Sequence, residues 1–326
     1  MIKADIGRDI GIARQILEEG DLVGIPTETV YGLAASAFDE KAAIKIFQVK
    51  NRPAFDPLIV HTNSVDRIRE FVSEIPEAAL GLFQRFSPGP LTVLLKRSNK
   101  IPDLVTSGSP LVAVRIPNHP LTLDLLSQLD FPVAAPSANP FGYVSPTSAF
   151  HVLDQLGTKI RYILDGGPAN VGIESTIVGF EKEEPVVYRL GGVSIEDLDR
   201  QLGKLKLNLI NNSQPASPGM LTSHYAPAKE VILAGVEDAL RRYHPGEIGA
   251  IVFKDYLVGI PKEQQIVLSK DGDLQEAARN LFSALRKLDE LPVKVVIAET
   301  VPDVDLGRAI NDRLGRAAAR RTPGHE

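Results

Sequence analysis

The chain has 326 residues, no cysteine and a formal net charge of −5 at pH 7. The lack of cysteine excludes disulfides, zinc–thiolate sites and cysteine nucleophiles, and the acidic balance lacks the basic footprint of a nucleic-acid-binding protein. No apolar run reaches the roughly 18 residues of a membrane span, and the amino terminus lacks the pattern of a signal peptide. We therefore expect a cytoplasmic globular protein, and its length predicts two domains.

Residues 1–206 alternate predicted helices and strands of the α/β class. The first helix carries apolar residues at helical spacing and ends at Gly20, and a strand over 22–25 follows it. Asp39 is placed to cap a second helix, which ends near Lys50. Several later strands are apolar throughout, which is typical of a sheet covered on both faces. These strands are expected at 58–60, 91–95, 112–114, 133–135, 162–164, 176–178 and 186–188.

The alternation breaks at residues 207–228, which have no period and are rich in Asn, Ser, Pro and Gly. Such a composition predicts a linker. From residue 229 the pattern restarts and predicts a smaller, mostly parallel, three-layer α/β domain over 229–326. Strands are expected at 231–233, 248–253, 266–268 and 293–297, and helices at 236–243, 274–288 and 305–320.

Three polar clusters in the first domain carry the side chains that an anionic ligand needs. A lysine and an arginine two residues apart supply a point charge and a bidentate fork for phosphate oxygens. Ser, Thr and Asn in turns supply hydroxyl and amide groups for a nucleotide or a hydrated metal ion. The clusters lie at 50–52, at 136–139 with 145–147, and at 172–176 with 189.

Lys50 and Arg52 have two interpretations. Cations at a helix end commonly complement the helix dipole, and Pro53 fits a simple helix stop. Alternatively, they bind a ligand. The next strand begins within a few residues and ends at His61, and ligands of open α/β sheets gather at the carboxyl ends of strands. On this hypothesis both motifs reach the same sheet edge.

Other polar residues are equally ambiguous. Arg115 ends an apolar strand, so its charge needs either a protein carboxylate or a substrate carboxylate. His61 in the same position is either a satisfied structural residue or part of a site. Ser137 and Asn139 fit turn chemistry as well as ligand binding, and Ser175 fits the start of a strand.

Eight segments together share their order and spacing with one known family. They are PTETVYGLA (26–34), KNRPAFDPLIVH (50–61), VAVRIPNHP (112–120), APSANPFGYVSPT (135–147), GIESTIV (172–178), YRLGG (188–192), SPGMLTSHYAP (217–227) and AINDRLGRAA (309–318). The chain resembles the YrdC-type threonylcarbamoyl-AMP synthases in their two-domain form. The resemblance implies an amino-terminal twisted, open, mixed sheet with helices around a concave cavity. It also implies a smaller Rossmann-like carboxyl-terminal domain.

The resemblance further implies a nucleotidyltransferase reaction. L-Threonine, bicarbonate or CO2, and ATP with Mg²⁺ give threonylcarbamoyl-AMP and pyrophosphate. The product would feed threonylcarbamoyladenosine formation at position 37 of tRNAs, through separate tRNA-modifying proteins. Neither a membrane nor a stable direct nucleic-acid contact is expected.

Site residues are implied at the positions that match the family motifs. Lys50 and Arg52 would be catalytic cations at the triphosphate, neutralising the charge that builds on pyrophosphate. Residues 207–228 would form a lid that excludes water. Further ATP contacts would come from Ser137, Asn139, Ser145, Arg189 and Tyr225, with Ser137 and Asn139 also facing the metal. The threonine pocket would be built by Thr27, His61, Arg115 and Ser175.

The chain departs from the family pattern in places, and two other functions remain as alternatives. Leu221 and Thr222 stand where a basic residue is expected, and Asp56 stands where Asn is common. A double-stranded RNA-binding module would use a concave basic surface, against which the net charge of −5 argues. A carbamoyl-phosphate-activating carbamoyl transferase domain would come with zinc-finger segments, for which this chain has no cysteine.

Overall fold

The computed structural model describes residues 3–210, 217–220, 225–233 and 235–319. The chain forms two compact units, the first made of Met1–Phe141 and Ser145–Leu221 and the second of Gly142–Val144 and Thr222–Glu326. The three residues 142–144 thus belong to the second unit although they interrupt the sequence of the first, which the sequence analysis did not predict. The predicted linker, 207–228, lies partly outside the described residues.

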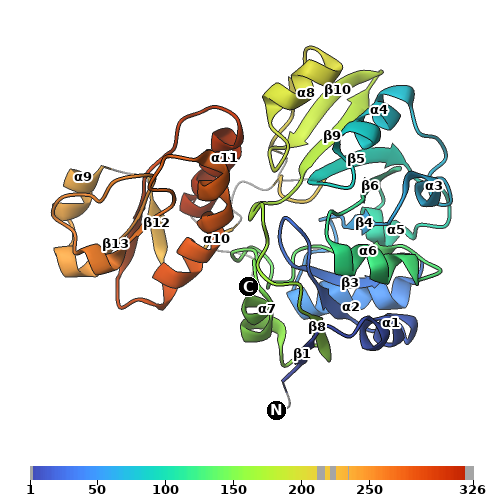
Figure 1. Ribbon diagram of the computed structural model, residues 1–326, viewed down its shortest axis with the longest axis horizontal. Coiled ribbons are helices and arrows are strands. Elements are labelled where there is room, and N and C mark those ends of the chain that lie inside the picture. The colour runs from blue at the N-terminus through green and yellow to red at the C-terminus, as the bar shows by residue number, and fades with distance from the viewer. Residues whose placement is uncertain (1–2, 211–216, 221–224, 234, 320–326) are drawn as a thin grey trace. The chain divides into compact units, whose positions relative to one another are not determined.

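The first unit is built on an eleven-stranded mixed sheet (Figure 1). Its order is β1-β8-β2-β3-β7-β4-β6-β5-β9-β10-β11, and it combines parallel pairs such as β4–β6 with antiparallel pairs such as β5–β6. The expected mixed sheet is confirmed. The strands are β1 (Asp5–Gly7), β2 (Val23–Ile25), β3 (Gly32–Ser36), β4 (Ile59–His61), β5 (Leu91–Lys96), β6 (Leu111–Arg115), β7 (Val133–Ala134), β8 (Tyr162–Leu164), β9 (Thr176–Glu181), β10 (Glu184–Arg189) and β11 (Lys206–Leu207).

Helices of the first unit begin where the sequence supplies caps. The side chains of Asp9, Asp39, Ser148 and Ser194 accept a backbone N–H at the start of α1, α2, α7 and α8, which satisfies donors that a helix start leaves unpaired. The helices are α1 (Ile10–Glu18), α2 (Glu40–Lys50), α3 (Val65–Ile68), α4 (Glu77–Phe86), α5 (Asp103–Thr106), α6 (Pro120–Ser127), α7 (Ala149–Leu156) and α8 (Ile195–Leu202).

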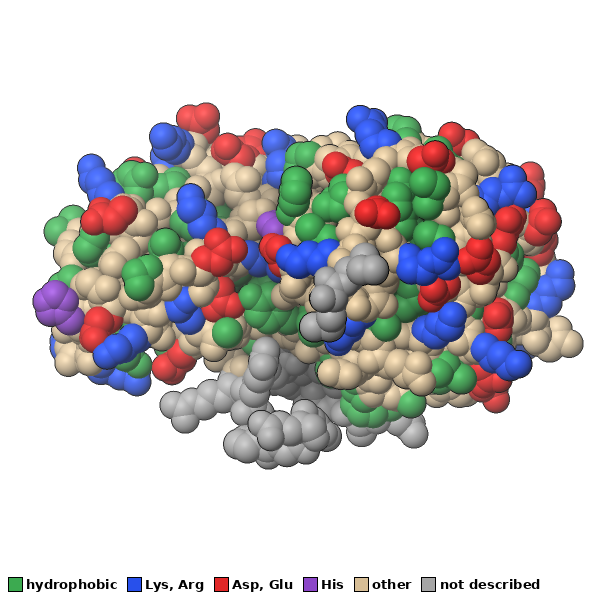
Figure 2. All heavy atoms as spheres, turned by 90° about the horizontal axis from the view of Figure 1, so that it is seen from below, with side chains coloured by type: hydrophobic (Ala, Val, Ile, Leu, Met, Phe, Trp, Pro, Cys, Tyr) green, Lys and Arg blue, Asp and Glu red, His purple; other side chains and the backbone are tan. Residues whose placement is uncertain are grey.

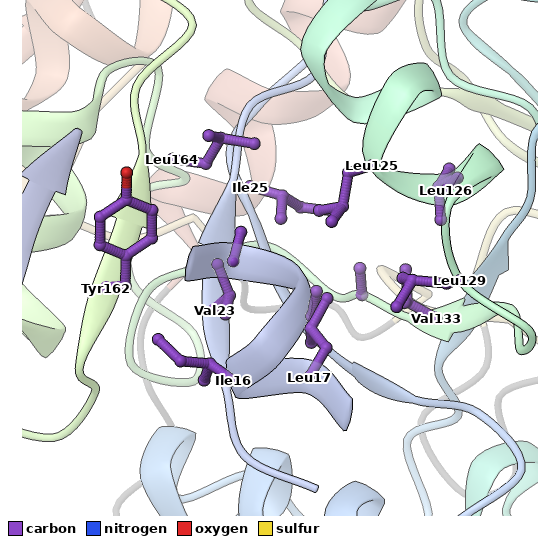
Figure 3. Close-up of a cluster of buried hydrophobic side chains, with 13 residues drawn as sticks. Ile16, Leu17, Val23, Ile25, Leu125, Leu126, Leu129, Val133, Tyr162 and Leu164 are labelled. Atoms are coloured by element: carbon purple, nitrogen blue, oxygen red, sulfur yellow. The ribbon is translucent and has the colours of Figure 1, made fainter. Parts of the chain in front are cut away.

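A buried apolar cluster fixes one end of the sheet (Figure 3). Ile16 and Leu17 of α1 and Leu125 of α6 pack with Val23 and Ile25 of β2. Burying one such side chain stabilises the fold by about 1.5–3 kcal/mol. Because β2 is anchored on this cluster, the polar loop that follows it at residue 26 starts from a fixed position.

The second unit has a four-stranded parallel sheet in the order β12-β15-β13-β14. Helices α10 and α11 pack on each other and on its strands, and α9 lies on the other side of the sheet (Figure 1). The expected smaller parallel domain is confirmed. Its elements are β12 (Glu230–Ile232), α9 (Val236–Leu240), β13 (Ile248–Val252), β14 (Gln265–Val267), α10 (Leu274–Glu290), β15 (Val295–Ala298) and α11 (Leu306–Ala318), with 3₁₀ turns at Pro245–Glu247 and Lys262–Gln264.

No helix among the described residues has the length and apolar character that crossing a membrane requires.

Candidate active site

A row of residues in register crosses five neighbouring strands of the large sheet. His61 of β4 is the partner of Arg115 of β6, and Arg115 is the partner of Thr92 of β5. Thr92 pairs with Ile177 of β9, which pairs with Arg189 of β10 next to a bulge. Side chains of directly paired residues lie on the same face of a sheet. The row therefore gathers a histidine, a threonine and two arginines from distant parts of the sequence.

Arg115 is buried and already has a carboxylate beside it. Its Nη2 lies 2.8 Å from Oε1 of Glu28, and its Nη1 donates to Oγ1 of Thr29 at 2.9 Å. Thr27 Oγ1 lies 2.8 Å from the same Thr29 oxygen. In the structure the partner of Arg115 is thus a protein carboxylate, which was one of the two alternatives left open by the sequence.

Arg189, at the other end of the row, is hydrogen-bonded to Ser175. It donates through Nε to the backbone oxygen of Ser175 and through Nη2 to its Oγ, both at 3.0 Å. That hydroxyl also lies 2.7 Å from Thr92 Oγ1. A β-carbon added at Gly191 would lie 2.6 Å from the Ser175 backbone oxygen, so only glycine allows the chain to pass so close there. Ser175, predicted for the threonine pocket, is joined directly to the predicted ATP contact Arg189.

His61 is a neutral imidazole. Its Nδ1 lies 3.1 Å from the backbone oxygen of Ile59. Because a carbonyl oxygen only accepts, Nδ1 carries the hydrogen and Nε2 is left as an acceptor. Burial lowers the pKa of His61 to about 3, and the charge of Arg115 acts in the same direction.

Lys50 is a buried cation rather than a solvated helix cap. Asn51 takes the left-handed conformation that ends α2, with a φ of 51°. Nζ of Lys50 donates to the backbone oxygens of Ser137, at 2.6 Å, and of Asn139. Burial lowers its pKa well below the usual value, and the nearby charge of Arg52 adds to this effect. These contacts join the first two polar clusters.

Arg52 is held by the segment that follows it. Its Nε donates to the backbone oxygen of Asp56 at 2.9 Å, and its Nη2 donates to that of Pro57 at 2.6 Å. Oδ2 of Asp56 lies 2.9 Å from Nη2, and the guanidinium lies 5.8 Å from the ring centroid of Phe141. Burial raises the pKa of Asp56, against the charge of Arg52. Asp56, a departure from the family pattern, is the buried counter-ion of Arg52.

The expectation that Lys50, Arg52 and His61 reach the same sheet edge is wrong. Lys50 contacts the loop after β7, which runs antiparallel to β4, and Arg52 contacts residues just before β4, whereas His61 ends β4. A strand of three residues is only about 10 Å long, so the two groups remain near each other. Accordingly, the charge of Arg189 lowers the pKa of both Asp56 and His61.

The second and third polar clusters meet at a carboxylate. Oγ of Ser145 donates to Oε1 of Glu174 at 2.6 Å, and both side chains are buried. The amide nitrogen of Asn139 donates to the backbone oxygen of Pro140 at 2.8 Å. Ser137 is half-buried. The structure thus connects all three clusters, although the sequence spreads them over most of the first unit.

The described parts of the linker divide between the two units. Met220 is fully buried in the first unit, where it packs with Ile59, Leu94 and Ala113 on the large sheet. Tyr225 is buried in the second unit. Its ring stacks on Phe282 at a centroid distance of 5.5 Å, and the Arg313 guanidinium carbon lies 4.9 Å from its centroid.

Two family models match the chain end to end. One, described as "Telomere recombination" and named for Sua5, YciO and YrdC, matches residues 15–191. The other, described as the threonylcarbamoyl-AMP synthase carboxyl-terminal domain, matches residues 193–319. The chain belongs to the threonylcarbamoyl-AMP synthase family.

Relatives within this synthase family are similar over nearly the whole chain. The threonylcarbamoyl-AMP synthase of Pyrococcus abyssi is 40% identical over 321 residues, covering 96% of this chain and 94% of the relative. That of Bacillus subtilis is 36% identical over 323 residues, covering 96% and 93%. The crystal structure of P. abyssi Sua5 complexed with L-threonine superposes with a TM-score of 0.87 at 38% identity, covering 98% of this chain and 97% of that one.

Three residues beside the expected site of the synthase were not predicted. Thr92 carried no sequence signal, because its place in the row depends on strand register. Glu28 lies inside the motif PTET, next to the expected ligand residue Thr27. Asp56 lies inside the motif KNRPAFD, four residues after the expected ligand residue Arg52. Their partners became evident only in the folded chain. The departures Leu221 and Thr222 lie outside the described residues.

Proposed function

We propose that this chain is an L-threonylcarbamoyladenylate synthase, which converts L-threonine, bicarbonate or CO2, and ATP into threonylcarbamoyl-AMP and pyrophosphate. Membership of the synthase family carries the assignment. The observation within the molecule that supports it is the row across the sheet, where Arg115 and Arg189 flank the hydroxyls of Thr92 and Ser175. Cations and hydroxyls in this arrangement suit a hydroxyl-bearing amino acid next to a nucleotide.

Threonine binding is assigned to the polar loop after β2 and to the row. The guanidinium of Arg115 has the fork that matches the two oxygens of an amino-acid carboxylate. The hydroxyl of Thr27 contacts Thr29, which accepts a hydrogen bond from Arg115. The hydroxyl of Ser175 contacts Thr92, which is paired with Arg115 in the sheet. His61, neutral and with Nε2 as acceptor, suits the hydroxyl proton of threonine. Together these residues would recognise both ends of the substrate.

ATP binding is assigned to the buried cations and their neighbours. The carbamate oxygen of the threonine derivative attacks the α-phosphorus of ATP while the bond to pyrophosphate breaks. Lys50 and Arg52 would offset the charge that develops on the leaving pyrophosphate. Further contacts are assigned to Ser137, Asn139, Ser145 and Arg189. The chain itself forms no covalent intermediate, so its role is to hold the reacting groups in line.

Magnesium would enter as part of the substrate, MgATP. The described residues contain no group of three His, Asp or Glu placed to hold a metal ion of their own. Mg²⁺ binds oxygen atoms and keeps several of its waters, and it commonly rides on substrate phosphates. The oxygens of Ser137 and Asn139 fit such an ion. Its contribution would be to neutralise phosphate charge.

The linker is assigned as a lid. Met220 packs on Ile59, Leu94 and Ala113. Each of these lies two residues from a member of the polar row in β4, β5 or β6 and therefore on the same face of the sheet. Met220 thus lies on the face that carries the site, where a closing segment would protect a labile carbamate from water. Tyr225, five residues later, is the proposed nucleotide contact of this lid.

The product is assigned to tRNA modification, by transfer to separate proteins that form threonylcarbamoyladenosine at position 37. The chain itself is not proposed as an RNA-binding module. Figure 2 shows Lys and Arg side chains interspersed with Asp and Glu on the face in view, without a basic field of one sign. A backbone-binding surface for RNA needs such a field.

Pyrophosphate release tests the function. The protein is incubated with MgATP and bicarbonate, together with one amino acid at a time. We expect release to require L-threonine and bicarbonate together. Equal turnover with unrelated amino acids, or none with threonine, would contradict the assignment. Salt-sensitive RNA binding without turnover would favour the alternative RNA-binding module.

A further inference from the structure

Glu28 is a buried carboxylate beside the guanidinium of Arg115, and none of the roles above uses it. Its side chain is 6% exposed, and its backbone oxygen accepts from the amide of Val171 at 2.7 Å. The loop is therefore fixed at this residue. Oε1 lies 2.8 Å from Nη2 of Arg115, so a negative and a positive charge meet in a position shielded from water.

This ion pair is poorly aligned. Neither oxygen of Glu28 accepts a hydrogen bond of good geometry from any residue that the structure describes, and Nη2 of Arg115 donates none. His119 also senses the charge of Glu28, but burial has the larger effect and lowers the pKa of His119. A buried carboxylate without aligned donors is costly. A ligand that brought N–H donors to Glu28 would remove this cost.

The pair also has the charges that complement an amino-acid zwitterion. In an α-amino acid two bonds separate the ammonium nitrogen from the carboxyl carbon, so the opposite charges lie about 3 Å apart. Arg115 and Glu28 present the complementary charges side by side, with Nη2 and Oε1 in contact at 2.8 Å. A zwitterion placed on the pair would meet an opposite charge at each end, and it would give the Glu28 oxygens and Nη2 of Arg115 the aligned hydrogen bonds that these three atoms lack.

We propose that Glu28 binds the α-ammonium group of the substrate while Arg115 binds its carboxylate. The inference rests on the proposed function, because it assigns Arg115 to the amino-acid carboxylate. In the absence of substrate the charge of Glu28 neutralises that of Arg115. The amino acid replaces this contact with two aligned ion pairs, one between its ammonium group and Glu28 and one between its carboxylate and Arg115. Glu28 thereby makes the site specific for an acid with a free, protonated α-amino group.

The test compares threonine with (2S,3R)-2,3-dihydroxybutanoate, in which a hydroxyl replaces the ammonium group. Binding of each to the full-length protein is measured by calorimetry. We expect the wild type to prefer threonine and Glu28→Gln to bind it about 10- to 100-fold more weakly. Affinity for the hydroxy acid should stay the same or rise, because the amide keeps the shape of the side chain but removes the negative charge.

Two further variants separate recognition from a structural role. Glu174→Gln removes another buried carboxylate of the motifs, which contacts Ser145, and it should leave the preference for threonine over the hydroxy acid intact. Glu28→Asp keeps the charge and should keep part of the preference. If Glu28→Gln weakens both ligands equally, or if Glu28→Asp loses the preference as fully as Glu28→Gln does, the proposal is overturned.

Failure of this inference is distinguishable from failure of the proposed function. Pyrophosphate release by the wild type with threonine tests the function alone. If that release occurs and Glu28→Gln retains the wild-type preference for threonine, the function stands and Glu28 is not the ammonium site. Should Glu28→Gln be unfolded by its melting curve, the decision rests on whether folded Glu28→Asp discriminates between the two ligands.

Discussion

Buried arginines occur in both units, but they contact different kinds of partner. Arg115 in the first unit meets Glu28 from a loop far away in the sequence, without an aligned hydrogen bond. Arg313 in the second unit contacts the adjacent Asp312 at 2.6 Å and lies over the ring of Tyr225. We propose that the first arrangement keeps a cation available for exchange with a ligand. The other uses a cation to hold the chain in place. Both arginines are buried, so the difference between them lies in how their charges are paired and not in burial.

The largest expected effect separates these two arginines. Arg115→Lys keeps the charge but loses the fork, so we expect the threonine concentration for half-maximal turnover to rise about 100-fold, equivalent to about 3 kcal/mol. ATP dependence should be nearly unchanged. Arg313→Lys is the matched change, and it should act chiefly by lowering the melting temperature. If the threonine titrations of Arg115→Lys superimpose on those of the wild type, Arg115 does not bind the substrate and does not differ from Arg313 in this respect.

Lys50 provides the next test, because its charge is held on backbone oxygens. Lys50→Met keeps the volume of the stem and removes Nζ. We expect turnover to fall about 10- to 100-fold through loss of a charge-assisted contact. The cost to folding should be modest, since burial already disfavours this charge. Turnover and thermal unfolding are measured together. A large drop in melting temperature with normal turnover would show a purely structural lysine.

His61 allows a test of burial through pH. Its pKa is lowered from 6.5 to about 3 in the fold, so below pH 6.5 the unfolded chain binds a proton that the folded chain does not. Stability from this group is complete above pH 6.5 and is lost as the pH falls towards 3, by about 1.4 kcal/mol per pH unit. Urea unfolding of His61→Gln between pH 4 and 7 should show a correspondingly weaker pH dependence. Parallel curves for both proteins would exclude a buried neutral histidine.

The smallest expected effect lies in the second unit. Asp289 accepts from the Tyr143 hydroxyl at 2.6 Å and from the amides of Ala228 and Lys229 at 2.9 Å. Asp289→Asn retains one acceptor oxygen, so we expect a loss of about 1 kcal/mol in the stability of this unit. Hydrogen exchange should accelerate at residues 228 and 229 and leave α2 unchanged. Unaltered exchange at both amides would show that Asp289 does not secure this segment.

Local patterns predicted most of the fold, while the site depended on long-range pairing. Most of the expected apolar strands and the capped helix ending at Lys50 lie within two residues of their expected bounds, because short-range sterics and side-chain alternation determine them. β9 runs three residues beyond its expected end, and the buried strand β3 was not predicted. The polar residues could be singled out by type. Their partners could not be, because the antiparallel β7 placed Lys50 and His61 at opposite ends of β4, and strand register placed Thr92 beside Arg115.

Residues 142–144 belong to the second unit, although the sequence on both sides of them belongs to the first. The chain passes between units on both sides of this segment as well as in the linker. Its neighbours are Phe141, which lies under the Arg52 guanidinium, and Ser145, which is bonded to Glu174. A segment of the second unit is therefore covalently joined, at both of its ends, to residues that contact Arg52 and Glu174.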